Sequence, residues 1–334
     1  MNKFPFFPFL IGLLITMMSS GSSEARQQSG PAPIVFAARI DDSRQFPGFL
    51  VMVESLRAFG GGMKDAPFWL YMPKAIIPSG AEAMAPFKVL RAEIKALDPP
   101  DDAAWYPLSS WVFSSAAAEA EAEGNASILA WLGGDTVFLQ EPKEFILPEG
   151  KALGYRPVFH RNICPLYEDP LDQYWTRAYE LMEVREASLF PMVTPADGDR
   201  IRPYFQAGCL AVRPEKGLLR KWREMFNVVS RDAAIKGICE KDGPKRTFTF
   251  QASLTGAFLN TLRRDEMLEF SGRINYPIFF REMFGAKRDF HDITDAVTVR
   301  YERFFADPPE GWDRQLKGPA DKIAWIKERL DKKP

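Results

Sequence analysis

Short apolar runs alternate with helical segments in the first half of the chain. The apolar runs have the length of buried strands and lie at residues 34–38, 67–73, 93–97 and 127–132. Apolar positions spaced three and four apart predict a helix at residues 49–59, and a second helix is predicted to run from residue 81 into the third strand. This alternation predicts an α/β fold, with a mostly parallel central sheet flanked by helices.

The second half of the chain is less regular. Its pattern predicts one strand at residues 206–212 and helices at residues 172–186, 218–229, 250–262 and 319–330. The last helix is expected to dock through Ile323, Trp325 and Ile326. The Ala/Glu-rich segment 116–123 is a strong helix former, and its charge predicts a solvated surface helix.

Composition narrows the function classes. The 334 residues carry 43 basic and 44 acidic side chains, so no global basic field exists to bind nucleic acid. The three cysteines are far apart in the sequence, and we expect them to be buried and inert. Only two histidines occur, His160 and His291, which excludes a three-histidine metal centre.

The N-terminus has the pattern of a signal peptide. Lys3 precedes an apolar run that ends at Met18, and small residues then lead to Ala25. We therefore expect a signal peptide at residues 1–25, a linker at 26–33 and a single domain at 34–330, in a secreted or periplasmic protein. The alternative is an uncleaved anchor that tethers the protein to a membrane.

Several common catalytic motifs do not occur in the sequence. There is no phosphate loop of the type GxxxxGK[ST], no GxGxxG, no GxSxG and no HExxH. Kinases, dinucleotide-dependent dehydrogenases, serine hydrolases and zinc proteases of those types are therefore excluded. A glycosidase with paired carboxylates has no specific support, since nothing in the sequence fixes such a pair.

One segment carries a family resemblance. An apolar strand at residues 128–132 runs into Gly133-Gly134-Asp135-Thr136, and a second apolar run ends at Glu141-Pro142. This resembles the DxD region of GT-A-fold nucleotide-diphospho-sugar transferases, a family of glycosyltransferases. In that family the acidic residues hold a divalent metal that binds the donor diphosphate.

Other segments resemble the family in the same order. The end of the first strand, at Ala37, Ala38 and Arg39, is expected to meet the nucleotide. Gln206-Ala207-Gly208 resembles the loop that approaches the donor sugar, and Gln251 lies in a segment resembling one that contacts sugar or acceptor. With Gly134 and Asp135, these are the residues that the resemblance implies for donor binding.

The resemblance also implies a metal, Mn²⁺ or Mg²⁺, held by Asp135 with His291. The alternatives are purely structural roles: a turn-capping aspartate for Asp135, a hydrogen-bonded histidine for His291 and a surface ion pair for Arg39. His160, Arg161 and Asn162 follow a strand-like run and are further candidates to line the cleft. No catalytic base can be assigned from the sequence.

Departures from the family pattern leave two functions open. Gly133 replaces the first acidic residue of DxD, Gln206 replaces the loop asparagine, and Phe250 and Ala252 replace both acids of an Asp-Gln-Asp motif. The first hypothesis is a glycosyltransferase that binds a nucleotide-diphospho-sugar through the metal and transfers the sugar to an unknown acceptor. The alternative is a catalytically inactive extracytoplasmic relative that binds glycan or a protein partner.

Overall fold

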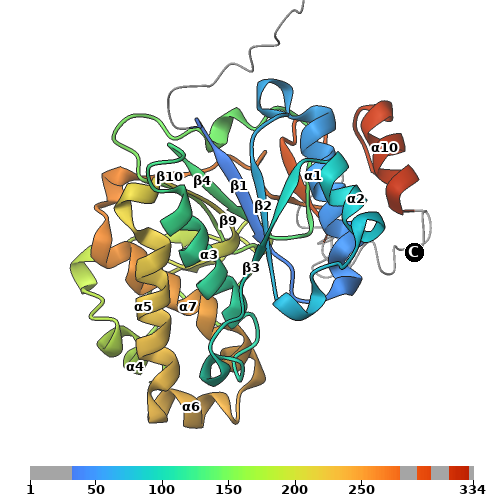
Figure 1. Ribbon diagram of the computed structural model, residues 1–334. Helices are drawn as coiled ribbons and strands as arrows, with labels where there is room; N and C mark the ends of the chain where they lie inside the picture. The colour runs from blue at the N-terminus through green and yellow to red at the C-terminus, as the bar shows by residue number, and fades with distance from the viewer. Residues whose placement is uncertain (1–31, 279–291, 302–315, 331–334) are drawn as a thin grey trace, which may run out of the picture. The chain divides into compact units, whose positions relative to one another are not determined.

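The computed structural model describes residues 32–278, 292–301 and 316–330. Its central sheet contains, in spatial order, β10 (Met267–Glu269), β6 (Leu153–Pro157), β9 (Phe205–Val212), β4 (Leu129–Leu132), β1 (Val35–Arg39), β2 (Phe68–Met72) and β3 (Ala92–Ala96). Neighbouring strands pair in parallel except β9, which is antiparallel to both β4 and β6 (Figure 1). The predicted α/β fold with a mostly parallel sheet is confirmed.

Helices cover both faces of this sheet. On one face lie α3 (Ser109–Ala122), α5 (Leu218–Arg231) and α7 (Gly243–Thr261), and on the other lies α1 (Phe46–Phe59), beside α2 (Ala81–Val89) (Figure 1). Because successive strand side chains point to opposite faces, β1 contributes to both cores. Val35 and Ala37 join the core on the α3 side, whereas Phe36 and Ala38 join the core on the α1 side.

Smaller elements complete the described structure. They are α4 (Gln173–Leu181), α6 (Ala233–Cys239), α10 (Ala320–Leu330), the strands β7 (Met192–Val193) and β8 (Arg200–Ile201), and a three-stranded sheet of β11 (Tyr276–Pro277), β12 (Thr298–Arg300) and β5 (Thr136–Phe138). The terminal helix docks as expected, with Ile326 buried and Trp325 in an edge-on ring contact with Phe59.

The direction of β9 brings distant segments to one edge of the sheet. Cys209 lies opposite Leu132 of β4, and Phe205 lies opposite Pro157 of β6. The first residues of β9 therefore stand beside the carboxyl ends of β4 and β6. In open α/β sheets, ligands bind at the carboxyl ends of the parallel strands.

The prediction of a solvated helix at residues 116–123 is wrong. That segment is the second half of α3, which packs between the sheet and α5, and Ala118 and Glu119 have no exposed surface. The small alanine side chains allow close approach of α5. The Glu119 carboxylate accepts hydrogen bonds from the backbone N–H groups of Leu219 (2.9 Å) and Arg220 (2.8 Å), which satisfies its charge at the start of α5.

Two other helix boundaries differ from the prediction. α7 begins at Gly243, seven residues before the expected start, because the Asp242 side chain accepts from the Lys245 N–H and caps the helix. α4 ends at Leu181 instead of 186, and Glu183 adopts a left-handed backbone with φ of 55°.

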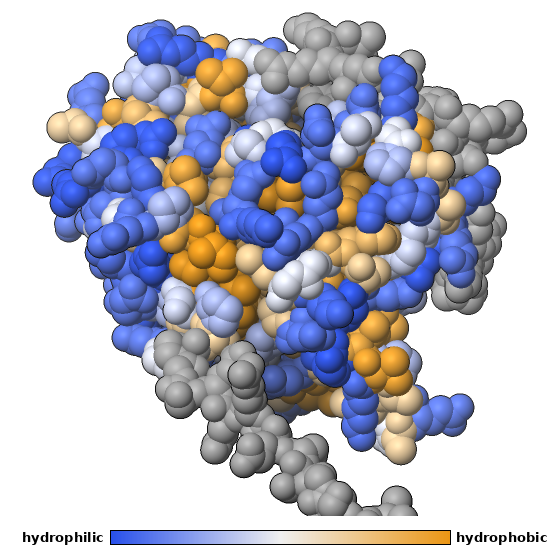
Figure 2. Space-filling view, turned by 90° about the horizontal axis from the view of Figure 1, so that it is seen from above, coloured by the Kyte–Doolittle hydropathy of each residue, from blue (hydrophilic) through white to orange (hydrophobic). Residues whose placement is uncertain are grey.

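The surface is mainly polar, as the composition leads one to expect. Viewed from the end at which β1 begins, hydrophilic side chains cover most of the described surface, with apolar patches between them (Figure 2). All three cysteines are buried and unpaired, and burial raises the pKa of Cys164 and Cys209 to about 12. None of the helices in the described ranges combines the length and the apolar character that a membrane span requires. The predicted signal peptide lies outside the described residues.

Candidate functional site

A cavity of about 480 Å³ lies at the edge of the sheet where β6 ends and β9 begins. Its walls come from the segment after β6, the start of β9, the first turns of α7, the start of α3 and the end of β12. The lining residues are Leu108, Trp111, Val158, Phe159, His160, Asn162, Gln206, Ala207, Gly208, Thr247, Phe248, Phe250, Gln251 and Arg300. Aromatic rings, side-chain amides and one guanidinium thus face a common space.

The turn between β4 and β5 lies next to this cavity. Its first residue, Gly133, donates its N–H to the carbonyl of Gly208 at 2.9 Å, which joins the turn to β9. Thr136 closes the turn, because its N–H and its hydroxyl both donate to the carbonyl of Gly133. Asp135 is held between these residues, with only 14% of its side chain exposed.

Strand pairing delivers Arg300 to the same turn. β12 runs antiparallel to β5, with Arg300 opposite Thr136, and the Tyr301 N–H donates to the carbonyl of Asp135. The Arg300 Nη2 lies 2.6 Å from the Asp135 Oδ1, and 13% of the arginine side chain is exposed. The result is a largely buried ion pair at the cavity wall.

The predicted donor loop lines the cavity. Gln206, Ala207 and Gly208 all border it, as does Gln251 from α7. The Gln251 Oε1 accepts the Ala207 N–H at 3.2 Å, and the Gln251 side chain is almost completely buried. Gln251 therefore fastens the start of β9 to α7, which leaves Gln206 as the more accessible amide of the two.

The predicted residues at the end of β1 do not line this cavity. Ala37 and Ala38 are fully buried in opposite cores. The Arg39 guanidinium is also buried and donates to the Asp41 carboxylate at 2.8 Å and to the Leu97 carbonyl at 2.7 Å. These contacts brace the end of β1 against its neighbours. A role of the three residues in nucleotide binding stays a prediction.

Of the three candidates after β6, His160 and Asn162 line the cavity. Burial lowers the pKa of the His160 imidazole below its ordinary value of 6.5, and the charge of Asp197 partly opposes this shift. Arg161 is not part of the lining, and its N–H donates to the Asp197 carboxylate at 2.9 Å.

The described residues alone do not form a site for the predicted divalent metal. Such a cation needs several oxygen ligands, yet no group of three or more His, Cys, Asp or Glu side chains with suitable geometry occurs in the described ranges. The Asp135 Oδ1 instead faces the guanidinium of Arg300. The second predicted ligand, His291, lies outside the described residues.

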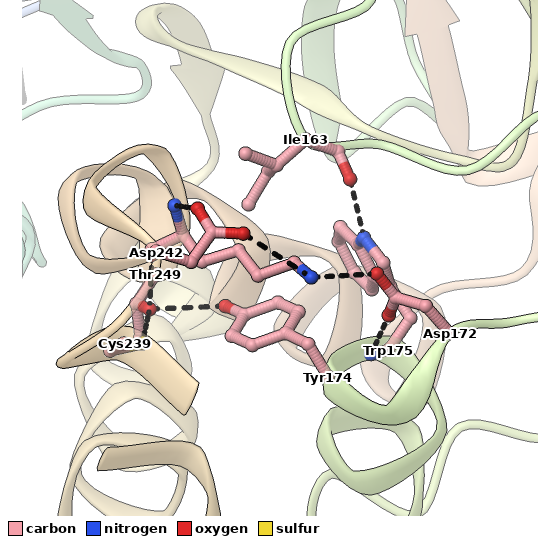
Figure 3. Close-up of polar contacts among 8 residues, drawn as sticks. Ile163, Asp172, Tyr174, Trp175, Cys239, Asp242 and Thr249 are labelled. Atoms are coloured by element: carbon pink, nitrogen blue, oxygen red, sulfur yellow. Dashed lines mark hydrogen bonds and ion pairs between the residues drawn. The ribbon is translucent and has the colours of Figure 1, made fainter. Parts of the chain in front are cut away.

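A polar network anchors two walls of the cavity to α4 (Figure 3). On one side, the Trp175 indole N–H donates to the Ile163 carbonyl at 2.6 Å, next to the lining residue Asn162. On the other side, the hydroxyl of Tyr174 in α4 lies 3.1 Å from the hydroxyl of Thr249 in α7. The lining therefore rests on α4 and α7, not on free loops.

Asp172 strengthens this junction from both directions. One of its carboxylate oxygens caps α4 by accepting the Trp175 N–H, and the other lies 2.8 Å from the Lys245 ammonium of α7 (Figure 3). Burial of the Lys245 ammonium opposes its charge, but its bonds to Asp172 and Asp242 leave its pKa raised. Helices α4 and α7 are thus joined by charge as well as by packing.

Sequence reasoning missed several lining residues, above all Arg300. The other missed residues are mostly apolar or aromatic: Leu108, Trp111, Val158, Phe159 and Thr247. Phe248 and Phe250 belong to the segment around Gln251 that the family resemblance had marked. The β-branched run Val297-Thr298-Val299 is typical of a strand, and Arg300 directly follows it, so this arginine could have been predicted to lie at a strand end. Its partner, however, could not be predicted from local pattern.

Comparison with known proteins decides the family. A family model described as Rhodobacterales glycosyltransferase domain matches residues 47–254, well over half of the chain. The chain belongs to this family. The match confirms the resemblance to glycosyltransferases, and it covers most of the cavity lining but not Arg300. No curated protein sequence matches the chain significantly.

Several solved glycosyltransferase structures are similar to this chain. A galactosyltransferase, LgtC, in complex with donor and acceptor sugar analogues is 16% identical, with 90% of this chain and 97% of that chain covered and a TM-score of 0.46. The core-mannan synthase Ktr4 of Aspergillus fumigatus, in its Mn/GDP form, is 10% identical over 73% of this chain and 74% of its own, with a TM-score of 0.44. The glycosyltransferase GlyE of Streptococcus pneumoniae is 11% identical, with coverages of 90% and 64% and a TM-score of 0.46.

Proposed function

We propose that this protein is a glycosyltransferase that binds a nucleotide-diphospho-sugar in the cavity beside β9 and transfers the sugar to an acceptor hydroxyl. The observation that carries the proposal is the convergence of the Gln206–Gly208 loop, the Asp135 turn and the start of α7 at one edge of the sheet, within a glycosyltransferase-family domain. A volume of about 480 Å³ suits a ligand of this size.

The lining residues suit sugar recognition. Side-chain amides donate and accept hydrogen bonds at once, and Asn162 and Gln206 offer such groups to sugar hydroxyls. The rings of Phe159, Phe248 and Trp111 supply apolar faces beside them. Arg300 is the one permanently charged side chain among the lining residues of the described chain.

The chemistry of the transfer is a substitution at the anomeric carbon. The bond between that carbon and the phosphate oxygen breaks, and its electron pair leaves with the nucleoside diphosphate. A bond to the acceptor oxygen forms, and the acceptor proton passes to solvent. The leaving group therefore gains negative charge, which favours a positively charged group near it.

A second function is a binding protein without turnover. It is favoured by one observation, the lack of any carboxylate among the cavity-lining residues in the described ranges. Such a relative would use the same amides and rings to hold glycan.

Two measurements separate these functions. Thermal unfolding in the presence of UDP, GDP and their sugars identifies the donor, because a ligand at a hundred times its dissociation constant adds about 2.7 kcal/mol to the free energy of unfolding. Release of the nucleoside diphosphate from the stabilising donor, in the presence of a panel of sugar acceptors, then tests turnover. Stabilisation by glycan alone, with no effect of any nucleotide, would contradict the transferase and support the binding protein.

We also propose that residues 1–25 form a cleaved leader that directs the protein to the secreted or periplasmic fraction. The support is the short apolar run between Lys3 and Met18 followed by small residues up to Ala25. N-terminal sequencing of the protein purified from its source should begin at Arg26. An intact N-terminus in the membrane fraction would instead support the anchored form.

A further inference from the structure

The guanidinium of Arg300 is built into the wall of the cavity. Its Nη2 lies 2.6 Å from the Asp135 Oδ1, and its Nε is buried with no hydrogen-bond partner in the described structure. The backbone of β12 fixes the base of the side chain, because Arg300 pairs with Thr136 in the strand ladder. The guanidinium is therefore held in place where Arg300 lines the cavity.

Two glycines make the space that this guanidinium occupies. A Cβ at position 133 would lie 3.3 Å from the Arg300 Cζ and Nη2, and 3.0 Å from the Asp135 Oδ1. A Cβ at position 208 would lie 3.1 Å from the Arg300 Nη1. Neither glycine has a positive φ, so the reason for glycine here is close approach and not backbone strain.

Position 133 is where the family pattern has the first acid of DxD. A side chain there would point at the Arg300 guanidinium, which therefore occupies the space that a second carboxylate beside Asp135 would need. The turn has lost one negative charge and gained a buried positive one. Both changes favour an anionic ligand over a divalent cation at this point.

We propose that Arg300 supplies the positive charge for the donor diphosphate, so that this transferase binds and uses its donor without a divalent metal. Asp135 is then a positioning residue that orients the guanidinium through its Oδ1. The guanidinium can donate a charge-assisted hydrogen bond to a phosphate oxygen, and its positive charge stabilises the electron pair that the leaving diphosphate takes from the anomeric bond. The proposal rests on the proposed glycosyltransferase function.

The test is nucleotide binding by the full-length protein, measured by isothermal titration calorimetry. UDP, GDP and UMP are titrated first in EDTA and then in excess Mn²⁺. We expect one nucleoside diphosphate to bind in EDTA, to bind more tightly than its monophosphate, and to gain no affinity from Mn²⁺. Binding that requires Mn²⁺ would overturn the proposal but leave the transferase function standing, whereas no nucleotide binding in either buffer would overturn both.

Variants test the residue itself. Arg300→Gln should weaken diphosphate binding in EDTA at least about tenfold while leaving the binding of the corresponding nucleoside less affected, and Arg300→Lys should recover part of the loss. The matched control is Arg91→Gln, which removes an exposed arginine whose Nη2 lies 2.5 Å from the Asp65 Oδ1. Arg91 directly precedes β3, at the end of the sheet where the parallel strands begin. Unchanged diphosphate affinity in Arg300→Gln would overturn the proposal. If that variant does not fold, the metal dependence of the unmodified protein decides the question alone.

Discussion

At the scale of single residues, the candidate site depends on two glycines. Gly133 and Gly208 let the backbones of the β4–β5 turn and β9 approach each other, with the Arg300 guanidinium against both. Asp135 and Arg300 share this space as a largely buried pair. A buried pair is costly to break, because the remaining charge is left without compensation.

Gly133→Ala should therefore destabilise the protein by about 1–3 kcal/mol, since the new Cβ meets a guanidinium that has little room to move. Urea unfolding at neutral pH measures the loss. Gly272→Ala is the matched control, because no atom lies within 4 Å of a Cβ built there. Equal stability of Gly133→Ala and the control would show that Arg300 is not held as described.

His160 gives a prediction that depends on pH. Burial holds the pKa of its imidazole below 6.5, so the unfolded chain takes up this proton before the folded one as pH falls. The contribution of neutral His160 to stability is complete above about pH 6.5 and is lost as pH falls through its folded-state pKa. The chain has only two histidines, so the His291→Gln variant leaves a single imidazole and an NMR titration then gives the pKa of His160.

The charge of Asp197 raises the His160 pKa, so Asp197→Asn should lower the titration midpoint further. Asp199→Asn, which removes a neighbouring carboxylate that faces Arg161, serves as the control and should change the midpoint less. A midpoint above 6.5 in the unmodified protein would contradict the burial of this ring.

The family resemblance predicted part of the candidate site, and the rest was missed for a physical reason. Asp135 and the Gln206–Gly208 loop lie in contiguous segments that resemble family motifs, so a single sequence is enough to mark them. Arg300 is distant in sequence and reaches Asp135 only through the pairing of β12 with β5. Its importance depends on a tertiary contact, which no periodicity records.

At the scale of elements, α3 shows the same limit. Its Ala/Glu composition predicts a helix correctly, but composition does not say which side the sheet covers. The burial of Glu119 follows from α5, whose first free N–H groups need an acceptor. A charged residue in a core is therefore explained by the end of a neighbouring helix.

Glu119→Ala should lower the free energy of unfolding by about 2 kcal/mol, because the capping bonds to Leu219 and Arg220 are lost in a buried setting. Glu123→Gln is the matched control, since Glu123 contacts the same Arg220 but is 44% exposed, and such pairs are worth about 1 kcal/mol or less. Chemical denaturation of both variants provides the comparison. A larger loss in Glu123→Gln would contradict this account of the cap.

The junction of α4 with the cavity wall makes a second element-scale prediction. Trp175→Phe keeps an aromatic ring but removes the donor to the Ile163 carbonyl, which should cost about 1–3 kcal/mol. It should also weaken donor binding, because Ile163 directly follows Asn162, which lines the cavity. Trp105→Phe, at a partly buried indole outside the cavity lining, is the control. A loss of stability without any change in donor affinity would show that the wall does not depend on this bond.

At the scale of the whole molecule, the sheet collects the site at one edge. The antiparallel β9 brings its first residues to the carboxyl ends of β4 and β6, and the small sheet of β5, β11 and β12 adds Arg300. The order of strands and helices in the first half followed from hydrophobic pattern. The antiparallel insertion of β9 did not, because strand direction is set by partners far away in sequence.

The most direct test of the account is a crystal structure with bound nucleotide, grown in Mn²⁺ and recorded at the manganese absorption edge. The nucleotide is whichever of UDP and GDP stabilises the protein more. We expect the diphosphate in the cavity beside β9, within hydrogen-bond distance of Arg300, and no anomalous peak between it and Asp135. A manganese peak coordinated by Asp135, with the Arg300 guanidinium displaced, would contradict the account, as would a nucleotide bound elsewhere.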